Sequence, residues 1–166
     1  EDIKEFTSSF DSVSLCLSKG LGAPVGSVLV GSKEFIKSAR RLRKILGGGM
    51  RQVGVLASAC IYAIENNVNR LKKDHELAKM FANHISQIPE IIVNSNEVET
   101  NMVYIKLPES ISLGLQDYLY KKDILISPPK LCPKGSHRIV FHKDIDRFGV
   151  EKLTDLIFNY LKSNIH

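Results

Sequence analysis

The amino-acid sequence predicts an α/β protein, because short stretches of β-branched and apolar residues alternate with longer amphipathic stretches. Its 166 residues are 43% hydrophobic and 25% charged, a balance that is typical of globular proteins and unlike that of disordered chains. This length supports one compact domain or two small ones. No apolar run approaches the roughly 20 residues that span a bilayer, and the N-terminus is polar. We therefore expect a cytoplasmic protein that does not associate with membranes.

The N-terminal region is predicted to form two strands joined by a turn-rich loop. Alternating polar and apolar residues indicate the first strand at residues 12–17, and a β-branched run between glycines indicates the second at 26–31. Strands so close to the N-terminus need sheet neighbours, and we expect these to come from polypeptide that precedes this sequence.

Two helices are predicted to follow these strands. Ser32 is suited to cap a helix that runs to about Leu46, and the three glycines 47–49 are suited to end it. Residues 51–66 have apolar side chains at a spacing of three and four, which predicts a second helix that is buried.

A long amphipathic helix is predicted over residues 67–88, just before Pro89. Its apolar stripe is expected to contain Leu71, His75, Ala78, Ala82 and Ile85. On that stripe His75 is interpreted as a packed core histidine and not as a catalytic group. A domain boundary is expected near residues 70–75.

The last third of the sequence predicts a small α+β domain. Strands are expected at residues 90–93, 102–107, 124–126 and 138–142, and helices at 108–120 and 148–161.

Cysteines and charges exclude some classes of site. Cys16, Cys60 and Cys132 are widely spaced, which predicts neither a disulfide framework nor a zinc site, and the first two lie in apolar stretches and are expected to be buried. The chain carries a net charge of +5, and residues 33–51 alone contain seven basic residues and one acid. The positive charge is therefore one local feature beside the glycine run.

Five motifs follow one another along the chain: Ser18–Ser27 (SKGLGAPVGS), Arg43–Gln52 (RKILGGGMRQ), Arg70–His75 (RLKKDH), Glu99–Val103 (ETNMV) and His137–His142 (HRIVFH). In this order they resemble the low-specificity L-threonine aldolase family, within the β-eliminating lyase and threonine aldolase group of enzymes that depend on pyridoxal 5'-phosphate (PLP). One motif alone would be weak evidence, whereas the ordered set extends over essentially the whole sequence. The resemblance is to the C-terminal half of the family.

The resemblance implies the C-terminal part of a PLP fold-type-I, aminotransferase-like protein, with the end of the large-domain sheet, connecting helices and a small α+β domain. Residues 1–72 would be the remnant of the PLP-binding large domain, and residues 73–166 the small domain. It also implies a homodimer or homotetramer. The implied reaction is retro-aldol cleavage of L-threonine or L-allo-threonine to glycine and acetaldehyde.

The resemblance makes Lys19 the catalytic lysine that binds the aldehyde of the PLP cofactor. Such an amine has to lose its proton near neutral pH, which requires a pKa lowered by burial or by nearby positive charge. Most lysines are solvated surface side chains, so the functional interpretation of Lys19 depends on the family context.

The other implied site residues are cationic. Lys44 and Arg51, beside the glycines 47–49, would reach toward the PLP phosphate or the substrate from the neighbouring subunit. Arg138 would bind the substrate α-carboxylate with its planar guanidinium. The alternatives are a solvated helix face for Lys44 and a surface ion pair at a sheet edge for Arg138. Residues 127–136 look longer and richer in proline than the usual family loop, and this loop could either shift Arg138 or merely bulge outward.

No metal site is predicted, because His137 and His142, five residues apart on a strand, would face opposite sides of it. The family residues that stack on the PLP ring and pair with its pyridine nitrogen do not map onto this sequence, so we expect the chain to be inactive alone. The alternative is a catalytically dead dimerisation or interaction fragment of the same family. Nucleic-acid binding is disfavoured, because the sequence has no Trp and no helix-turn-helix signature.

Overall fold

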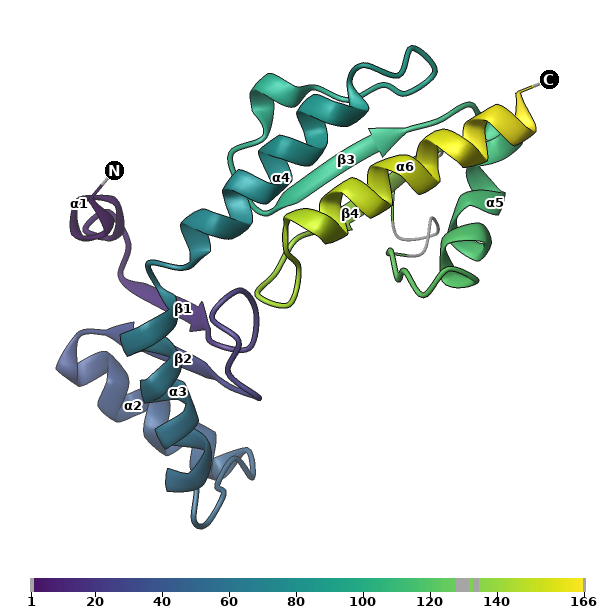
Figure 1. Cartoon of the computed structure of the whole chain (residues 1–166). Helices are drawn as coiled ribbons and strands as arrows, with labels where there is room; N and C mark the ends of the chain where they lie inside the picture. The colour runs from purple at the N-terminus through teal and green to yellow at the C-terminus, as the bar shows by residue number, and fades with distance from the viewer. Residues whose placement is uncertain (1, 128–131, 133–134, 166) are drawn as a thin grey trace. The chain divides into compact units, whose positions relative to one another are not determined.

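The structure is a computed structural model that describes residues 2–127, 132 and 135–165. The chain divides into two compact units, Glu1–Asn69 (unit 1) and Arg70–His166 (unit 2), whose elements are labelled in Figure 1. Within the described residues, no helix combines the length and the apolar character that crossing a bilayer requires.

Unit 1 contains an antiparallel pair of strands. β1 (Ser12–Cys16) pairs with β2 (Ser27–Gly31), and Leu15 lies opposite Val28 in their register. A short helix, α1 (Ile3–Thr7), precedes them. Both strands predicted near the N-terminus are confirmed. The ten residues between the strands, 17–26, form a loop that carries Lys19.

Two further helices complete unit 1. α2 (Lys33–Ile45) begins as predicted, since the Ser32 hydroxyl accepts a hydrogen bond from the Phe35 N–H at 3.2 Å. The helix ends just before Gly47, whose φ of +82° is a left-handed conformation that glycine adopts without strain. α3 (Gly54–Asn67) follows, so the second predicted helix is confirmed with a later start.

Burial in unit 1 differs from the prediction. Its described part buries only four apolar side chains: Leu17, Leu21, Ala23 and Ala63. α3 is therefore not the buried helix that its periodicity suggested, and Ile61 and Tyr62 are more than half exposed. Cys16 is exposed and Cys60 only partly buried, because the rest of unit 1 leaves their surroundings open. An apolar period identifies a helix face but does not supply the surface that covers it.

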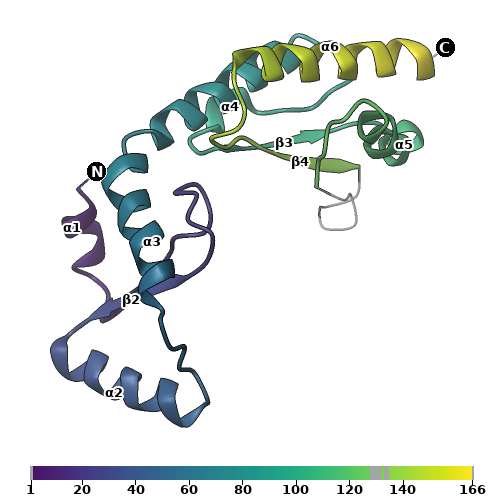
Figure 2. The ribbon, with the colours of Figure 1, turned by 60° about the horizontal axis from the view of Figure 1, so that its bottom comes forward.

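Unit 2 is a helix-covered strand pair. Its elements are α4 (Leu71–Ile85), η1 (Ser95–Glu97), β3 (Met102–Lys106), α5 (Glu109–Tyr120), β4 (Ser136–Val140) and α6 (Arg147–Asn164). β3 and β4 pair antiparallel, and Figure 2 shows α4 and α6 on the same side of them. The predicted strands at 102–107 and 138–142 and the predicted helices at 108–120 and 148–161 are thus confirmed, with small differences at their ends.

The core of unit 2 is a single cluster of apolar side chains. Alternate residues of both strands face inward, with Val103 and Ile105 buried on β3 and Ile139 buried on β4. The rings of Phe81 and Phe141 meet there with centroids 5.5 Å apart. This cluster holds β4, and with it Arg138, in a fixed register against β3.

Two predicted strands of unit 2 are wrong. Residues 124–126 form no strand: Asp123 turns the chain at φ +60°, Leu125 is 81% exposed, and its two isoleucine neighbours pack against the core. Residues 90–93 contribute only an isolated bridge between Ile92 and Lys106. A short apolar run can form a strand, or it can be a loop whose apolar side chains pack against the core. The composition of the run does not distinguish these two structures.

The predicted stripe of α4 is confirmed at Ala78, Ala82 and Ile85 but is wrong in the first turns of the helix. His75 is exposed, which overturns its interpretation as a core histidine, and the preceding residue Asp74 is buried in its place. The helix begins at Leu71, four residues later than predicted. Asp74 can be buried because its ion pair with Arg70 offsets the cost of removing a carboxylate from water. The spacing of apolar residues gives no indication of such a pair.

Candidate active site

The loop of residues 17–26, here called the lysine loop, is closed by backbone hydrogen bonds. The Leu17 N–H donates to the Gly26 carbonyl, and the Ala23 N–H donates to the Leu17 carbonyl, both at 3.0 Å. Leu17, Leu21 and Ala23 are buried, so most of the small core of unit 1 comes from this loop. Gly26 has a φ of +114°, which a residue with a side chain rarely adopts. The loop is therefore an anchored structure and not a loose connection.

Lys19 lies on a tight turn within the lysine loop. Its carbonyl accepts a hydrogen bond from the Gly22 N–H at 2.8 Å, while its side chain is exposed. The nearby Leu17 and Leu21 point into the unit 1 core. An exposed amine on a backbone that buried neighbours hold in place can react with an aldehyde from a defined position.

The thiol of Cys16 lies close to this turn. Its Sγ is 3.5 Å from the Ser18 Oγ, and hydrogen bonds from Ser18 and then Ser27 lower the pKa of Cys16, with the charge of Lys19 a smaller cause. Three groups from the lysine loop and its flanking strands thus stabilise negative charge beside Lys19.

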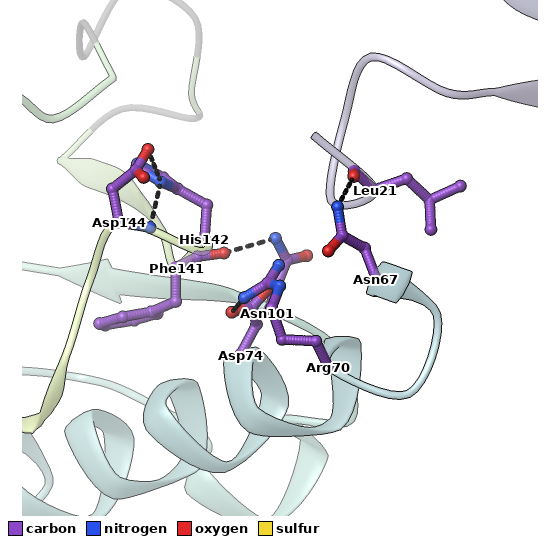
Figure 3. A network of polar contacts seen from close by, with 8 residues as sticks. All are labelled: Leu21, Asn67, Arg70, Asp74, Asn101, Phe141, His142 and Asp144. Atoms are coloured by element: carbon purple, nitrogen blue, oxygen red, sulfur yellow. Dashed lines mark hydrogen bonds and ion pairs between the residues drawn. The ribbon is translucent and has the colours of Figure 1, made fainter. Parts of the chain in front are cut away.

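Helix α3 contacts the lysine loop through two side chains. The Asn67 Nδ2 donates to the Leu21 carbonyl at 2.6 Å, a contact drawn in Figure 3, and the Cys60 Sγ donates to the Val25 carbonyl at 3.3 Å. Sequence reasoning did not identify Asn67. The only available signal was an amide side chain at the end of a helix, which is common at helix ends for other reasons.

The cationic residues of unit 1 gather around the turn after α2. The Gly48 N–H donates to the Arg43 carbonyl at 2.7 Å, and the Lys44 side chain lies over Gly49, where an added Cβ would be 3.2 Å from its Nζ. Arg51 is exposed on the next turn, at residues 51–53. The structure brings Lys44 and the glycines together, whereas Figures 1 and 2 both show this turn apart from the lysine loop.

Arg138 lies on β4 of unit 2, opposite Tyr104 on β3. Its Nε donates to the Ser127 hydroxyl at 3.3 Å, and the side chain is partly exposed. Most of the predicted proline-rich loop, residues 128–131 and 133–134, lies outside the described residues. A role for Arg138 in the same site as Lys19 stays a prediction.

Unit 2 also contains two buried polar pairs that sequence reasoning missed. The Asp74 carboxylate accepts two hydrogen bonds from the Arg70 guanidinium at 2.7 and 2.8 Å (Figure 3). The His137 Nε2 is 2.9 Å from the Ser112 hydroxyl. Burial lowers the pKa of His137, and a smaller contribution from the Ser112 backbone acts in the opposite direction. The first pair lies at the start of α4, whereas the second joins α5 to β4. Within the described ranges, no group of three or more His, Cys, Asp or Glu side chains could hold a metal ion.

Comparison with known proteins gives a consistent set of relatives. The family model for beta-eliminating lyases matches residues 1–108. The low specificity L-threonine aldolase of Escherichia coli K12 is 42% identical over 146 residues, which cover 88% of this chain and 41% of that protein. Low-specificity L-threonine aldolase 1 of Arabidopsis thaliana is 48% identical over 111 residues, or 67% of this chain and 31% of that protein. The chain thus spans well under half the length of these relatives.

Solved structures show the same fold at low identity. A Listeria monocytogenes structure assigned as an L-allo-threonine aldolase superposes with a TM-score of 0.75 at 19% identity, covering 99% of this chain and 47% of that one. The serine palmitoyltransferase of Sphingomonas wittichii gives a TM-score of 0.72 at 14% identity, covering 96% and 42%. These matches confirm the fold class predicted from the sequence.

Proposed function

This chain belongs to the beta-eliminating lyase family, and we propose that it supplies the lysine loop and carboxylate-binding arginine of a PLP-dependent aldolase. The proposed reaction breaks the carbon–carbon bond of L-threonine or L-allo-threonine and yields glycine and acetaldehyde. The observation that carries the proposal is the position of Lys19, an exposed amine on a turn that buried neighbours anchor, within the family-matched part of the chain.

The side chains of unit 1 fit PLP by their chemistry. Lys19 offers an amine for its aldehyde, and Lys44 lies over a glycine turn whose backbone amides, with Arg51, suit a phosphate. When bound, PLP supplies the electron sink for the carbanion that remains after the carbon–carbon bond breaks. The separation of the lysine loop from the glycine turn supports the idea that Lys44 and Arg51 act on a neighbouring subunit's site.

Arg138 is proposed to orient the substrate. Its Nε is bonded to Ser127, whereas its two terminal nitrogens make no hydrogen bond within the part of the chain that is described. Those nitrogens form a fork that matches the two oxygens of a carboxylate. In this role Arg138 would hold the α-carboxylate and so fix which substrate bond is broken.

The wider organisation follows from the same proposal. Residues 1–72 would belong to the PLP-binding domain and residues 73–166 to the small domain of a cytoplasmic homodimer or homotetramer. All five residues of β2 are exposed, although they are mostly apolar, which supports further polypeptide packing against this strand.

A second candidate function is a catalytically dead interaction fragment. The observation in its favour is α3, where Val55, Ile61 and Tyr62 are each more than half exposed. Such an apolar helix face could pair with full-length subunits without any chemistry at Lys19.

Capture of the cofactor tests the proposal. The purified chain is mixed with PLP, reduced with borohydride and mapped by mass spectrometry of its peptides. We expect labelling to concentrate on Lys19 and to be lost in Lys19→Ala. Lys37→Ala is the matched control, because Lys37 is another exposed lysine of unit 1, and it should keep the Lys19 label.

The outcomes separate the two candidate functions. Labelling spread evenly over exposed lysines, Lys19 included, would contradict the proposed cofactor site. If the chain also binds full-length relatives without changing their release of acetaldehyde from L-threonine, the interaction fragment is supported instead.

A further inference from the structure

We infer that Asn67 is a positioning residue for Lys19, acting through the backbone of the lysine loop. The inference rests on the function proposed above, because it assigns Asn67 a task only if Lys19 is the reactive amine. All of the residues involved lie in unit 1.

One face of α3 lies along the lysine loop. Cys60, Ala63 and Asn67 are three and four positions apart, a spacing that places side chains on the same side of a helix. Ala63 is the only buried residue of α3, and the two side chains flanking it donate hydrogen bonds to the Val25 and Leu21 carbonyls. The helix therefore contacts the loop on both sides of a buried alanine.

The Asn67 contact fixes the turn that carries Lys19. The hydrogen bond from the Gly22 N–H to the Lys19 carbonyl closes a turn in which Leu21 is an inner residue. The Leu21 carbonyl of that turn accepts the 2.6 Å hydrogen bond from Asn67, 46 residues further along the chain. Because that peptide group is tied to a helix, the direction in which Lys19 leaves the turn is restricted.

The neighbouring asparagine provides a matched control. The Asn66 Nδ2 donates to the Tyr62 carbonyl at 2.8 Å, within its own helix, and the Asn66 side chain is exposed. Asn66 and Asn67 are thus adjacent residues of one type, of which only Asn67 contacts the lysine loop. If a substitution acts by disturbing α3 in general, replacing either asparagine should have the same effect. If it acts on Lys19, only the replacement of Asn67 should have an effect.

The test compares Asn67→Ala, Asn67→Asp and Asn67→Gln with Asn66→Ala in the full chain. Aspartate has the shape of asparagine but lacks the amide donor, whereas glutamine keeps the donor on a longer side chain. We expect the rate at which Lys19 captures PLP to fall about 10- to 100-fold in the alanine and aspartate variants. Glutamine should recover part of the rate, and Asn66→Ala should match the unsubstituted chain.

A second readout does not depend on PLP. Hydrogen–deuterium exchange of the amides of residues 17–26, measured without cofactor, should become faster in Asn67→Ala and Asn67→Asp only. Protection of the paired amides of β1 and β2, which lie in unit 1 outside the loop, serves as an internal check that unit 1 of each variant is folded. If Asn67→Gln is the only Asn67 variant that folds, we expect its rate of PLP capture to lie between those of Asn66→Ala and Lys19→Ala. A capture rate equal to that of Asn66→Ala, with unchanged exchange of residues 17–26, would then contradict the inference.

Two results would overturn the inference, and they differ in what they leave standing. If Asn67→Ala equals Asn66→Ala in both readouts while Lys19→Ala abolishes capture, Asn67 does not position the loop and the proposed function stands. If Lys19→Ala leaves capture unchanged, the proposed function fails, and the role of Asn67 toward Lys19 fails with it.

Discussion

Among single residues, His137 shows how strongly burial can decide the state of a side chain. It is fully buried on β4, its Nε2 contacts the Ser112 hydroxyl, and its Nδ1 has no hydrogen-bond partner within the described residues. Such surroundings favour the neutral imidazole, and burial lowers the pKa of His137 from its ordinary value of 6.5. A proton added to this ring would have to be accommodated in the apolar core of unit 2.

This burial predicts a loss of stability in mild acid. Below about pH 6.5 the unfolded imidazole binds a proton while the folded one does not, so the unfolded state takes up more protons and the free energy of unfolding falls. The slope should approach about 1.4 kcal/mol per pH unit until the folded pKa is reached. Urea unfolding of unit 2 between pH 8 and pH 5 measures it.

The substitution His137→Gln should reduce this pH dependence, since glutamine can bond Ser112 but does not titrate. The control is His142→Gln, which removes another histidine of unit 2 whose side chain is half exposed and not in the core. An unchanged slope in His137→Gln would show that other groups cause the acid sensitivity.

At the scale of elements, α5 and α6 approach closely because α5 has a glycine at their contact. A Cβ on Gly114 would lie 2.5 Å from the Tyr160 hydroxyl, which donates to the Ile111 carbonyl at 2.6 Å. The Tyr160 ring also contacts Tyr118, with centroids 5.1 Å apart. One missing methyl group thus sets the distance between two helices of unit 2.

The substitution Gly114→Ala should therefore destabilise unit 2 by about 1–3 kcal/mol, because the Tyr160 hydroxyl has to move. The variant Tyr160→Phe removes that hydroxyl and makes room for the methyl group. In a double-mutant cycle followed by thermal unfolding, the pair should be less destabilised than the sum of the single variants. Additive losses would mean that Tyr160 is not the group that excludes a side chain at position 114.

For the whole molecule, the two units differ in how much apolar surface they bury. Unit 2 has a continuous core that reaches from α4 to α6, whereas the described part of unit 1 buries four apolar side chains. Three of those four belong to the lysine loop. Unit 1 by itself therefore has little hydrophobic stabilisation, and most of what it has holds the segment that carries Lys19.

We expect the two units to unfold separately as a consequence. In hydrogen exchange with increasing urea, amides of β1 and α3 should lose protection at lower urea than those of α4, β3 and α6. Phe81→Ala should destabilise unit 2 by about 3–5 kcal/mol and leave exchange in unit 1 unchanged. A single transition shared by all elements would contradict this separation.

Some residues of the candidate site could be predicted from the sequence, and others could not. Lys19, Lys44, Arg51 and Arg138 follow from motifs, and their roles remain proposals, although the structure anchors the turn of Lys19 and folds Lys44 over the glycines. Asn67 could not be predicted, because its partner is 46 residues away and an amide side chain at a helix end has many uses.

The sequence by itself determined most of the strands and helices, the Ser32 cap, the glycine end of α2 and the lysine loop, since these depend largely on neighbours within one turn or strand. Only the tertiary structure decided which faces are covered: His75 and Cys16 are exposed, and Asp74 and His137 are buried. Burial depends on residues that are distant in sequence. The periodicity of a segment indicates that one face is apolar, but it does not indicate which residues pack against that face.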